Sequence, residues 1–102
     1  MVEDPFVADF LRTILQRKGY RVMPMDADDG VNLLRAGDRS IDLLITNLPA
    51  VFTEFAELVP LLYLAAFPDL DAALPFRASR VLRKPFHPEQ LLSCVEQLLL
   101  PV

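Results

Sequence analysis

The chain has little cysteine, little glycine and no tryptophan, and it carries no excess of positive charge. Its one cysteine, Cys94, cannot form an internal disulfide, and Cys94 and His87 have no neighbouring ligands with which to hold zinc. The 14 acidic and 10 basic residues give a formal net charge of −4, which argues against binding to nucleic acid or to an anionic membrane. No apolar run approaches the roughly 20 residues that cross a bilayer, and the N-terminus shows no apolar signal region. We therefore expect a reduced, cytoplasmic domain that binds neither nucleic acid nor membranes.

Apolar residues are plentiful and make up 53% of the 102 residues. A chain of this length suits one domain, and it can bury roughly two thirds of its unfolded surface. The sequence has no recognisable linker, internal repeat or low-complexity segment. We therefore expect a single domain over residues 1–102.

Helical spacing of apolar residues predicts three main helices. The first has Asp4 as its cap, Pro5 in its first turn and Gly19 just past its end. The second is predicted over Ala27–Ala36. The last begins near Pro88, and its core face is expected to consist of Leu91, Leu92, Val95, Leu98 and Leu99.

Four short apolar runs predict strands that alternate with the helices. The predicted strands are Tyr20–Met25, Ile41–Thr46, Leu61–Phe67 and Ser79–Arg83. The almost continuous apolar run before Asn47 is typical of a strand covered on both faces, whereas Pro24 suits an edge strand or a strand end. Two short helical segments, Thr53–Leu58 and Asp69–Leu74, separate the later strands. The alternation predicts an α/β fold with a parallel sheet between layers of helices.

Three motifs together resemble the receiver domain of bacterial response regulators. They are the acidic pair Glu3 and Asp4, the stretch IDLLITN ending at Asn47, and RKPF, which contains Lys84 and Pro85. The segments GYRV, DADDGVNLL and FHPEQLLSCVEQLL are similar to that family's second strand, second helix and last helix, so the resemblance covers essentially the whole chain. It implies a flavodoxin-like doubly wound parallel sheet with flanking helices, in which the first strand and the third helix are truncated.

The family's activity depends on an aspartate at the end of its third strand, which receives a phosphoryl group from a histidine kinase. Two acidic residues hold Mg²⁺ there, a Thr or Ser ends the fourth strand, and a Lys ends the fifth. Carboxylates and water are ligands that Mg²⁺ prefers, and the metal and the lysine neutralise charge during the transfer. The resemblance implies that Glu3 and Asp4 form the acidic pocket and bind Mg²⁺ weakly or not at all. It also implies that Lys84 is the pocket lysine and that a cis peptide bond precedes Pro85.

Three of the family's working positions carry residues that cannot perform the same chemistry. Asn47 falls on the phospho-acceptor aspartate, Ala65 on the Thr or Ser, and Val81 on an aromatic switch position. An amide cannot form an acyl phosphate, although it keeps the shape and hydrogen bonding of aspartate. The resemblance therefore implies a pseudo-receiver with no catalytic residue and no required cofactor. Such a domain would bind a histidine kinase, a response regulator, a transcription factor or a second copy of itself through Asp69 to Val102.

Other interpretations of the same residues remain open. Asn47 could bond a turn at the end of its strand, and Glu3 and Asp4 could be a helix cap and a favourable charge at a helix N-terminus. Lys84 could pair with Asp4 or point into solvent. The domain could still be phosphorylated by a histidine kinase on another carboxylate, such as Asp42 or Asp4, or it could be a decayed structural fragment.

The first strand of the family has almost no counterpart in this sequence. Two residues precede Glu3, whereas a strand generally has about five residues. A missing central strand would leave two unpaired backbone edges. We expect that the native chain begins further upstream, that Val2 makes a stub, or that a partner segment fills the gap, as in a strand-paired dimer.

Aromatic residues outside the motifs are expected in the core. Because the third helix is shortened, the face of the sheet that it leaves should be closed by Phe52, Phe55 and Leu58. Tyr63 and Phe67, on the fourth strand of the resemblance, are expected to be buried as well.

Overall fold

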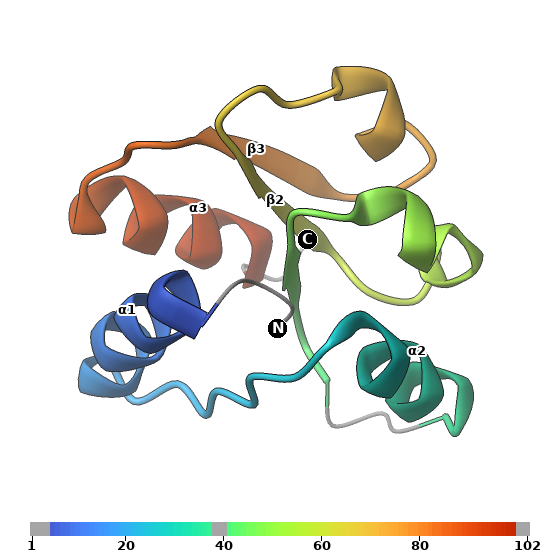
Figure 1. Ribbon diagram of the computed structural model, residues 1–102, viewed down its shortest axis with the longest axis horizontal. Helices are drawn as coiled ribbons and strands as arrows, with labels where there is room; N and C mark the ends of the chain where they lie inside the picture. The colour runs from blue at the N-terminus through green and yellow to red at the C-terminus, as the bar shows by residue number, and fades with distance from the viewer. Residues whose placement is uncertain (1–4, 38–40, 100–102) are drawn as a thin grey trace.

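The structure is a computed structural model that describes residues 5–37 and 41–99. Within these residues the chain forms one sheet of three parallel strands between two layers of helices (Figure 1). The α/β class predicted from the alternating pattern is therefore confirmed at this coarse level. Glu3 and Asp4 lie outside the described residues, and so do the expectations that rest on them.

Three α-helices, three strands and two 3-10 helices make up the described fold. The α-helices are α1 (Pro5–Arg17), α2 (Ala27–Arg35) and α3 (Pro88–Leu99). The strands are β1 (Leu44–Thr46), β2 (Leu61–Ala65) and β3 (Ser79–Arg83). The 3-10 helices are η1 (Pro49–Phe55), between β1 and β2, and η2 (Leu70–Ala73), between β2 and β3.

The helix ends follow from local chemistry. Gly19 and Gly37, just after α1 and α2, both have positive φ, at 89° and 80°, a conformation that glycine adopts without steric cost. At the start of α2, the Asp26 carboxylate accepts a hydrogen bond of 2.8 Å from the Asp29 N–H, which satisfies one of the free donors of the first turn. The predicted starts and stops of these helices are confirmed to within a residue or two.

The sheet has the order β1-β2-β3, with every pair of neighbours parallel. Successive side chains of the central strand β2 point to opposite faces. Leu61 and Tyr63 belong to the core cluster on one face, and Leu62 and Leu64 belong to the cluster on the other. Because helices cover both faces, β2 is apolar at every position, as the continuous run in the sequence predicted.

Each face of the sheet has its own set of helices. On the first face, α1 and α3 pack against the sheet, and Figure 1 shows them side by side. The buried residues of this cluster are Leu11, Leu15, Ile45, Leu62, Leu64, Leu82, Leu91 and Val95. On the second face lie α2, η1 and η2 (Figure 1). Its buried residues are Leu44, Phe52, Phe55, Ala56, Val59, Leu61, Tyr63, Ala73 and Phe76.

The prediction of a strand over Tyr20–Met25 is wrong, because this segment forms no strand in the described structure. An apolar cavity separates it from β1, so it does not pair with that strand. Pro24 also lacks the N–H that a ladder would use. The sheet of the described residues therefore has three strands.

Two predictions of burial are also wrong. Phe67 is 96% exposed, because β2 ends at Ala65, whose partner Arg83 is the last residue of β3. Leu58 is 75% exposed, and Val59, the next residue, is buried against the sheet in its place. Phe52 and Phe55 are buried as expected. The 3-10 helix η1 supplies both of these rings.

Candidate functional site

Three of the predicted site residues lie at the carboxyl ends of the three strands. Asn47 follows β1 directly, Ala65 is the last residue of β2, and Lys84 follows β3 directly. Because the strands are parallel, their carboxyl ends meet at one edge of the sheet, where α/β proteins bind their ligands. The Lys84 N–H donates a hydrogen bond of 3.0 Å to the Ala65 carbonyl oxygen. The structure therefore brings Asn47, Ala65 and Lys84 to the same edge.

Asn47 is half-buried at the point where β1 becomes a loop. The turn there is held by its neighbour, because the Oγ1 of the fully buried Thr46 accepts a hydrogen bond of 2.9 Å from the Leu48 N–H. The side-chain amide of Asn47 has no hydrogen bond with any of the described residues. The interpretation of Asn47 as the residue that bonds the turn is therefore not supported.

Lys84 and Pro85 shape the end of β3. The peptide bond between them is cis, as the resemblance implied. Lys84 is half-buried and Pro85 is exposed. The proposed salt bridge from Lys84 to Asp4 lies outside the described residues.

Val81 occupies the middle of β3 and lies opposite Tyr63 in the register of the sheet. It is half-buried and packs against the core cluster on the α2 face. An aliphatic side chain therefore fills the position at which the resemblance would place an aromatic ring. Such a branched side chain has few rotamers and no long arm to move between two positions.

The hydroxyl group of Tyr63 has a role that the sequence analysis missed. Tyr63 is buried on β2, and its hydroxyl oxygen accepts a hydrogen bond of 3.0 Å from the Asp69 N–H. This bond ties the loop after β2 to the carboxyl edge of the sheet. The available signal was the residue type itself, since a buried tyrosine usually finds a partner for its hydroxyl group.

The described residues at this edge offer little to a metal ion. Across residues 5–37 and 41–99, no group of three or more His, Cys, Asp or Glu residues comes together. Asn47 contributes one neutral amide oxygen, whereas Mg²⁺ is usually held by carboxylates and water. A magnesium site would rest on Glu3 and Asp4, so this prediction is not tested. The side-chain amide of Asn47 can donate and accept hydrogen bonds, but it is not a nucleophile towards a phosphoryl group.

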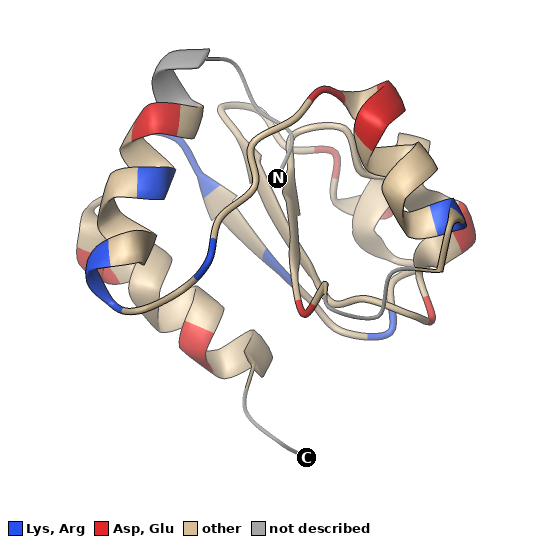
Figure 2. Cartoon of the chain, turned by 90° about the horizontal axis from the view of Figure 1, so that it is seen from below, with Lys and Arg blue, Asp and Glu red and all other residues tan. Residues whose placement is uncertain are grey.

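Along the described part of the ribbon in Figure 2, Lys and Arg positions (blue) alternate with Asp and Glu positions (red) and form no continuous basic stripe in that view. Two ion pairs occur among the described residues. The distance between Arg35 Nη2 and Glu54 Oε1 is 2.6 Å, and this pair joins α2 to η1. The distance between Arg12 Nη2 and Asp9 Oδ1 is 2.8 Å, and this pair lies within α1. Both pairs are exposed, so each contributes little to stability.

The only cysteine, Cys94, is half-buried on α3. Burial raises the pKa of its thiol above the usual value, and the positive charge of Arg80 opposes this rise. A thiol with a raised pKa has little thiolate at neutral pH and reacts slowly.

Comparisons with models of known families, with curated proteins and with solved structures find no match for this chain. Among the described residues, no helix combines the length and the hydropathy that crossing a membrane requires. The function is therefore argued from the geometry of the site and from the resemblance in sequence.

Proposed function

We propose that this chain is a receiver-like domain of two-component signal transduction that no longer accepts a phosphoryl group and acts by binding another protein. The observation that carries the proposal is the placement of Asn47, Ala65 and Lys84 at the ends of three neighbouring parallel strands, with a cis peptide bond after Lys84. These are the positions to which the resemblance assigns the acceptor, the hydroxyl residue and the pocket lysine.

The arrangement of helices around the sheet supports the same proposal. The first and last helices, α1 and α3, share one face, and α2, η1 and η2 share the other. A flavodoxin-like doubly wound sheet also has helices on both faces, and in such a sheet β1, β2 and β3 would correspond to the third, fourth and fifth strands of the receiver family.

The loss of phosphotransfer follows from the side chains at this edge. The Asn47 amide is not a nucleophile towards a phosphoryl group. Ala65 has no hydroxyl group with which to bind a phosphoryl oxygen, and Val81 is packed against the core. A domain with these residues cannot use the phosphorylation cycle of the family, so a partner protein would have to set its state.

The alternative acceptor Asp42 is poorly placed. It precedes β1, whereas Lys84 follows β3, so the two residues lie towards opposite ends of the parallel sheet. A phosphoryl group on Asp42 would therefore lie away from the lysine that neutralises charge in the family. The geometry favours a binding role over this enzymatic one.

The proposed binding surface is an apolar patch after β2, which we define as Phe67, Leu70 and Leu74. These side chains are 96%, 62% and 76% exposed, and they lie on η2 and on the two loop segments beside it. Single exposed apolar residues are common, but three large ones within eight residues are typical of a surface that a protein partner covers. The patch overlaps the region that the resemblance implies for dimerisation and partner binding.

A binding experiment tests this proposal with a matched pair of variants. The wild-type chain is titrated against a second copy of itself and against purified histidine kinases, response regulators and transcription factors from its own genome. Leu74→Asp should weaken binding by about 10- to 100-fold, because a charge replaces an apolar side chain that is buried in the complex. Leu58→Asp is the control, because Leu58 is 75% exposed outside the patch, and it should leave the affinity unchanged. Equal losses in both variants, or no binding to any of these proteins, would contradict the proposal.

A further inference from the structure

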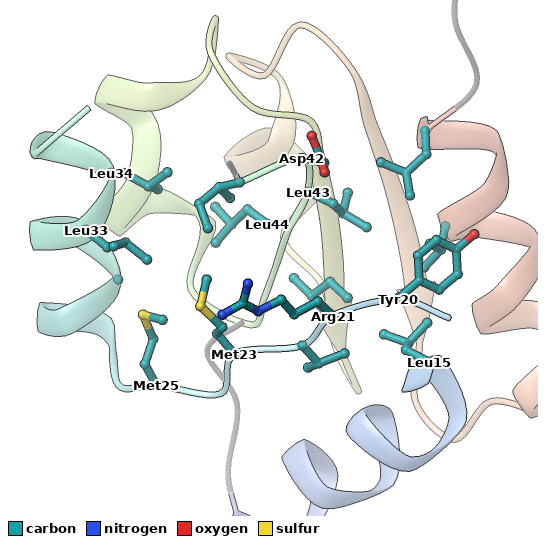
Figure 3. A pocket seen from close by; sticks show the side chains of 16 residues that line it. Leu15, Tyr20, Arg21, Met23, Met25, Leu33, Leu34, Asp42, Leu43 and Leu44 are labelled. Atoms are coloured by element: carbon teal, nitrogen blue, oxygen red, sulfur yellow. The ribbon is translucent and has the colours of Figure 1, made fainter. Parts of the chain in front are cut away.

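An apolar cavity of about 440 Å³ lies beside the free edge of β1. One wall is the extended segment Tyr20–Met25, and the opposite wall is the chain from Ile41 to Ile45. Figure 3 shows side chains from both walls, including Met23 and Leu44, together with Leu33 of α2, around this space.

The cavity opens onto both faces of the sheet. Leu15, Ile45 and Val95, which line it, belong to the core cluster on the α1 and α3 face. Leu44 and Leu34 also line it, and they belong to or pack against the cluster on the α2 face. An occupant that touches both clusters must therefore lie in the plane of the sheet, where a further strand would lie, and present apolar groups to both sides.

The edge of β1 offers hydrogen bonds to such an occupant. The Leu44 N–H donates to the Pro60 carbonyl oxygen at 3.0 Å, so Leu44 is turned towards β2. A parallel strand uses alternate residues for its two neighbours, so the N–H and C=O of Ile45 are turned the other way, towards the cavity. No strand of the described residues lies on that side. Buried backbone groups without partners are costly.

Two opposite charges complete the lining. Arg21 and Asp42 are the only charged residues among those that line the cavity, and both side chains are exposed. Neither forms an ion pair within the described part of the chain. They are therefore available to one acidic and one basic group of an occupant.

We propose that this cavity binds an extended peptide segment of another protein, which adds a strand to the free edge of β1. A small apolar molecule would leave the Ile45 backbone groups unpaired, and a helix has no free backbone groups along its length to offer them. An extended segment can form backbone hydrogen bonds with the edge of β1, and its alternate side chains can pack against the core clusters on the two faces of the sheet. The matching segment is about five residues long, apolar on both faces, and flanked by an acidic residue for Arg21 and a basic residue for Asp42. This inference does not depend on the receiver-like function.

The test uses the whole chain and a blocked, fluorescent peptide, Glu-Val-Ile-Val-Leu-Val-Lys. Fluorescence anisotropy should show saturable binding, and hydrogen exchange of the Ile45 amide should slow at least tenfold when the peptide is bound. The same peptide with proline at its three central positions should not bind, because it lacks the N–H groups that a ladder needs.

Two chain variants locate the site. Leu33 lines the cavity and belongs to neither core cluster, so Leu33→Lys should keep the helical circular dichroism spectrum and weaken peptide binding at least tenfold. Leu74→Lys changes an exposed residue outside the cavity and should have no effect. Arg21→Glu should weaken binding about two- to fivefold, as expected for an exposed ion pair, and a peptide in which only the Glu is replaced by Lys should restore it.

Three results would overturn the inference. The first is no peptide binding up to millimolar concentration, or equal binding of the proline peptide. The second is a dimer in sedimentation experiments that Leu33→Lys dissociates, which would assign the cavity to a second copy of this chain. The third is displacement of the peptide by an apolar dye with no change in exchange at Ile45 in either complex, which would assign it to small molecules.

Discussion

At the residue scale, the proposed pseudo-receiver departs from the family at Asn47 and Ala65, which lie at the carboxyl edge of the sheet. Asn47 has an amide nitrogen where an aspartate would have a charged oxygen, and Ala65 lacks a hydroxyl group. The surrounding backbone bonds do not depend on either side chain, since Thr46 holds the turn after β1 and the Lys84 N–H bonds to the Ala65 carbonyl. The chemistry can therefore be lost while the local backbone is kept.

The hydroxyl group of Tyr63 gives a prediction at this scale. Tyr63→Phe removes the acceptor of the Asp69 N–H and should lower the free energy of unfolding by about 0.5–1.5 kcal/mol, the usual net contribution of one hydrogen bond. Urea denaturation measures the change. Tyr20→Phe is the control, because the Tyr20 hydroxyl has no hydrogen bond among the described residues, and its effect should stay within about 0.5 kcal/mol. Similar effects of the two variants would show that the Tyr63 bond does not stabilise the loop.

At the element scale, the short helix η1 covers much of one face of the sheet. It does so with two buried aromatic rings, Phe52 and Phe55. The Arg35–Glu54 ion pair also joins η1 to α2, but it is exposed and contributes little. The packing of η1 therefore depends on its aromatic rings.

Replacing the ring of Phe52 by a methyl group should lower the stability of the fold strongly. Phe52 is fully buried, so Phe52→Ala should lower the free energy of unfolding by about 3–5 kcal/mol, a large part of the 5–15 kcal/mol available to a typical domain. Phe67→Ala makes the same chemical change at a 96% exposed site and should cost no more than about 0.5 kcal/mol. Denaturant titration of both variants tests this, and a small loss for Phe52→Ala would show that η1 does not anchor the face.

The elements that the sequence predicted well are those with a strong local signal. Helices α1, α2 and α3 have a clear apolar face and recognisable ends, and β2 is a short apolar run between turns. The strand predicted at Tyr20–Met25 failed because an apolar run carries no information about whether a neighbour exists to pair with it. Phe67 and Leu58 were wrongly predicted to be buried. The sequence pattern does not distinguish an apolar residue just after an element from an apolar residue within it.

The sequence predicted which residues lie at the candidate site, but it did not predict the hydrogen bonds and the cavity near them. Asn47, Ala65 and Lys84 were located through the resemblance, and the parallel topology of the strands brings them to one edge. The sequence pattern alone had extended the strand that holds Ala65 to Phe67. The bond from the Asp69 N–H to Tyr63 and the cavity beside β1 could not be predicted, because both depend on how segments far apart in the sequence come together. Glu3 and Asp4 lie outside the described residues.

At the scale of the whole molecule, β1 connects the two proposed features. Its free edge borders the apolar cavity, and its carboxyl end carries Asn47. On the proposed function, phosphate no longer sets the state of the domain, so control would pass to proteins that bind it. The patch of Phe67, Leu70 and Leu74 and the edge of β1 are two separate surfaces at which such binding can be measured.

The central claim is that the scaffold of a receiver is retained and only its acceptor chemistry is lost. Intact-mass spectrometry after incubation with acetyl phosphate and Mg²⁺, run on the wild-type chain and on Asn47→Asp, tests it most directly. We expect no adduct on the wild type and one phosphoryl group on the variant, because the substitution restores a carboxylate nucleophile at the edge that carries Lys84. An adduct on the wild-type chain, or no adduct on either protein, would contradict it.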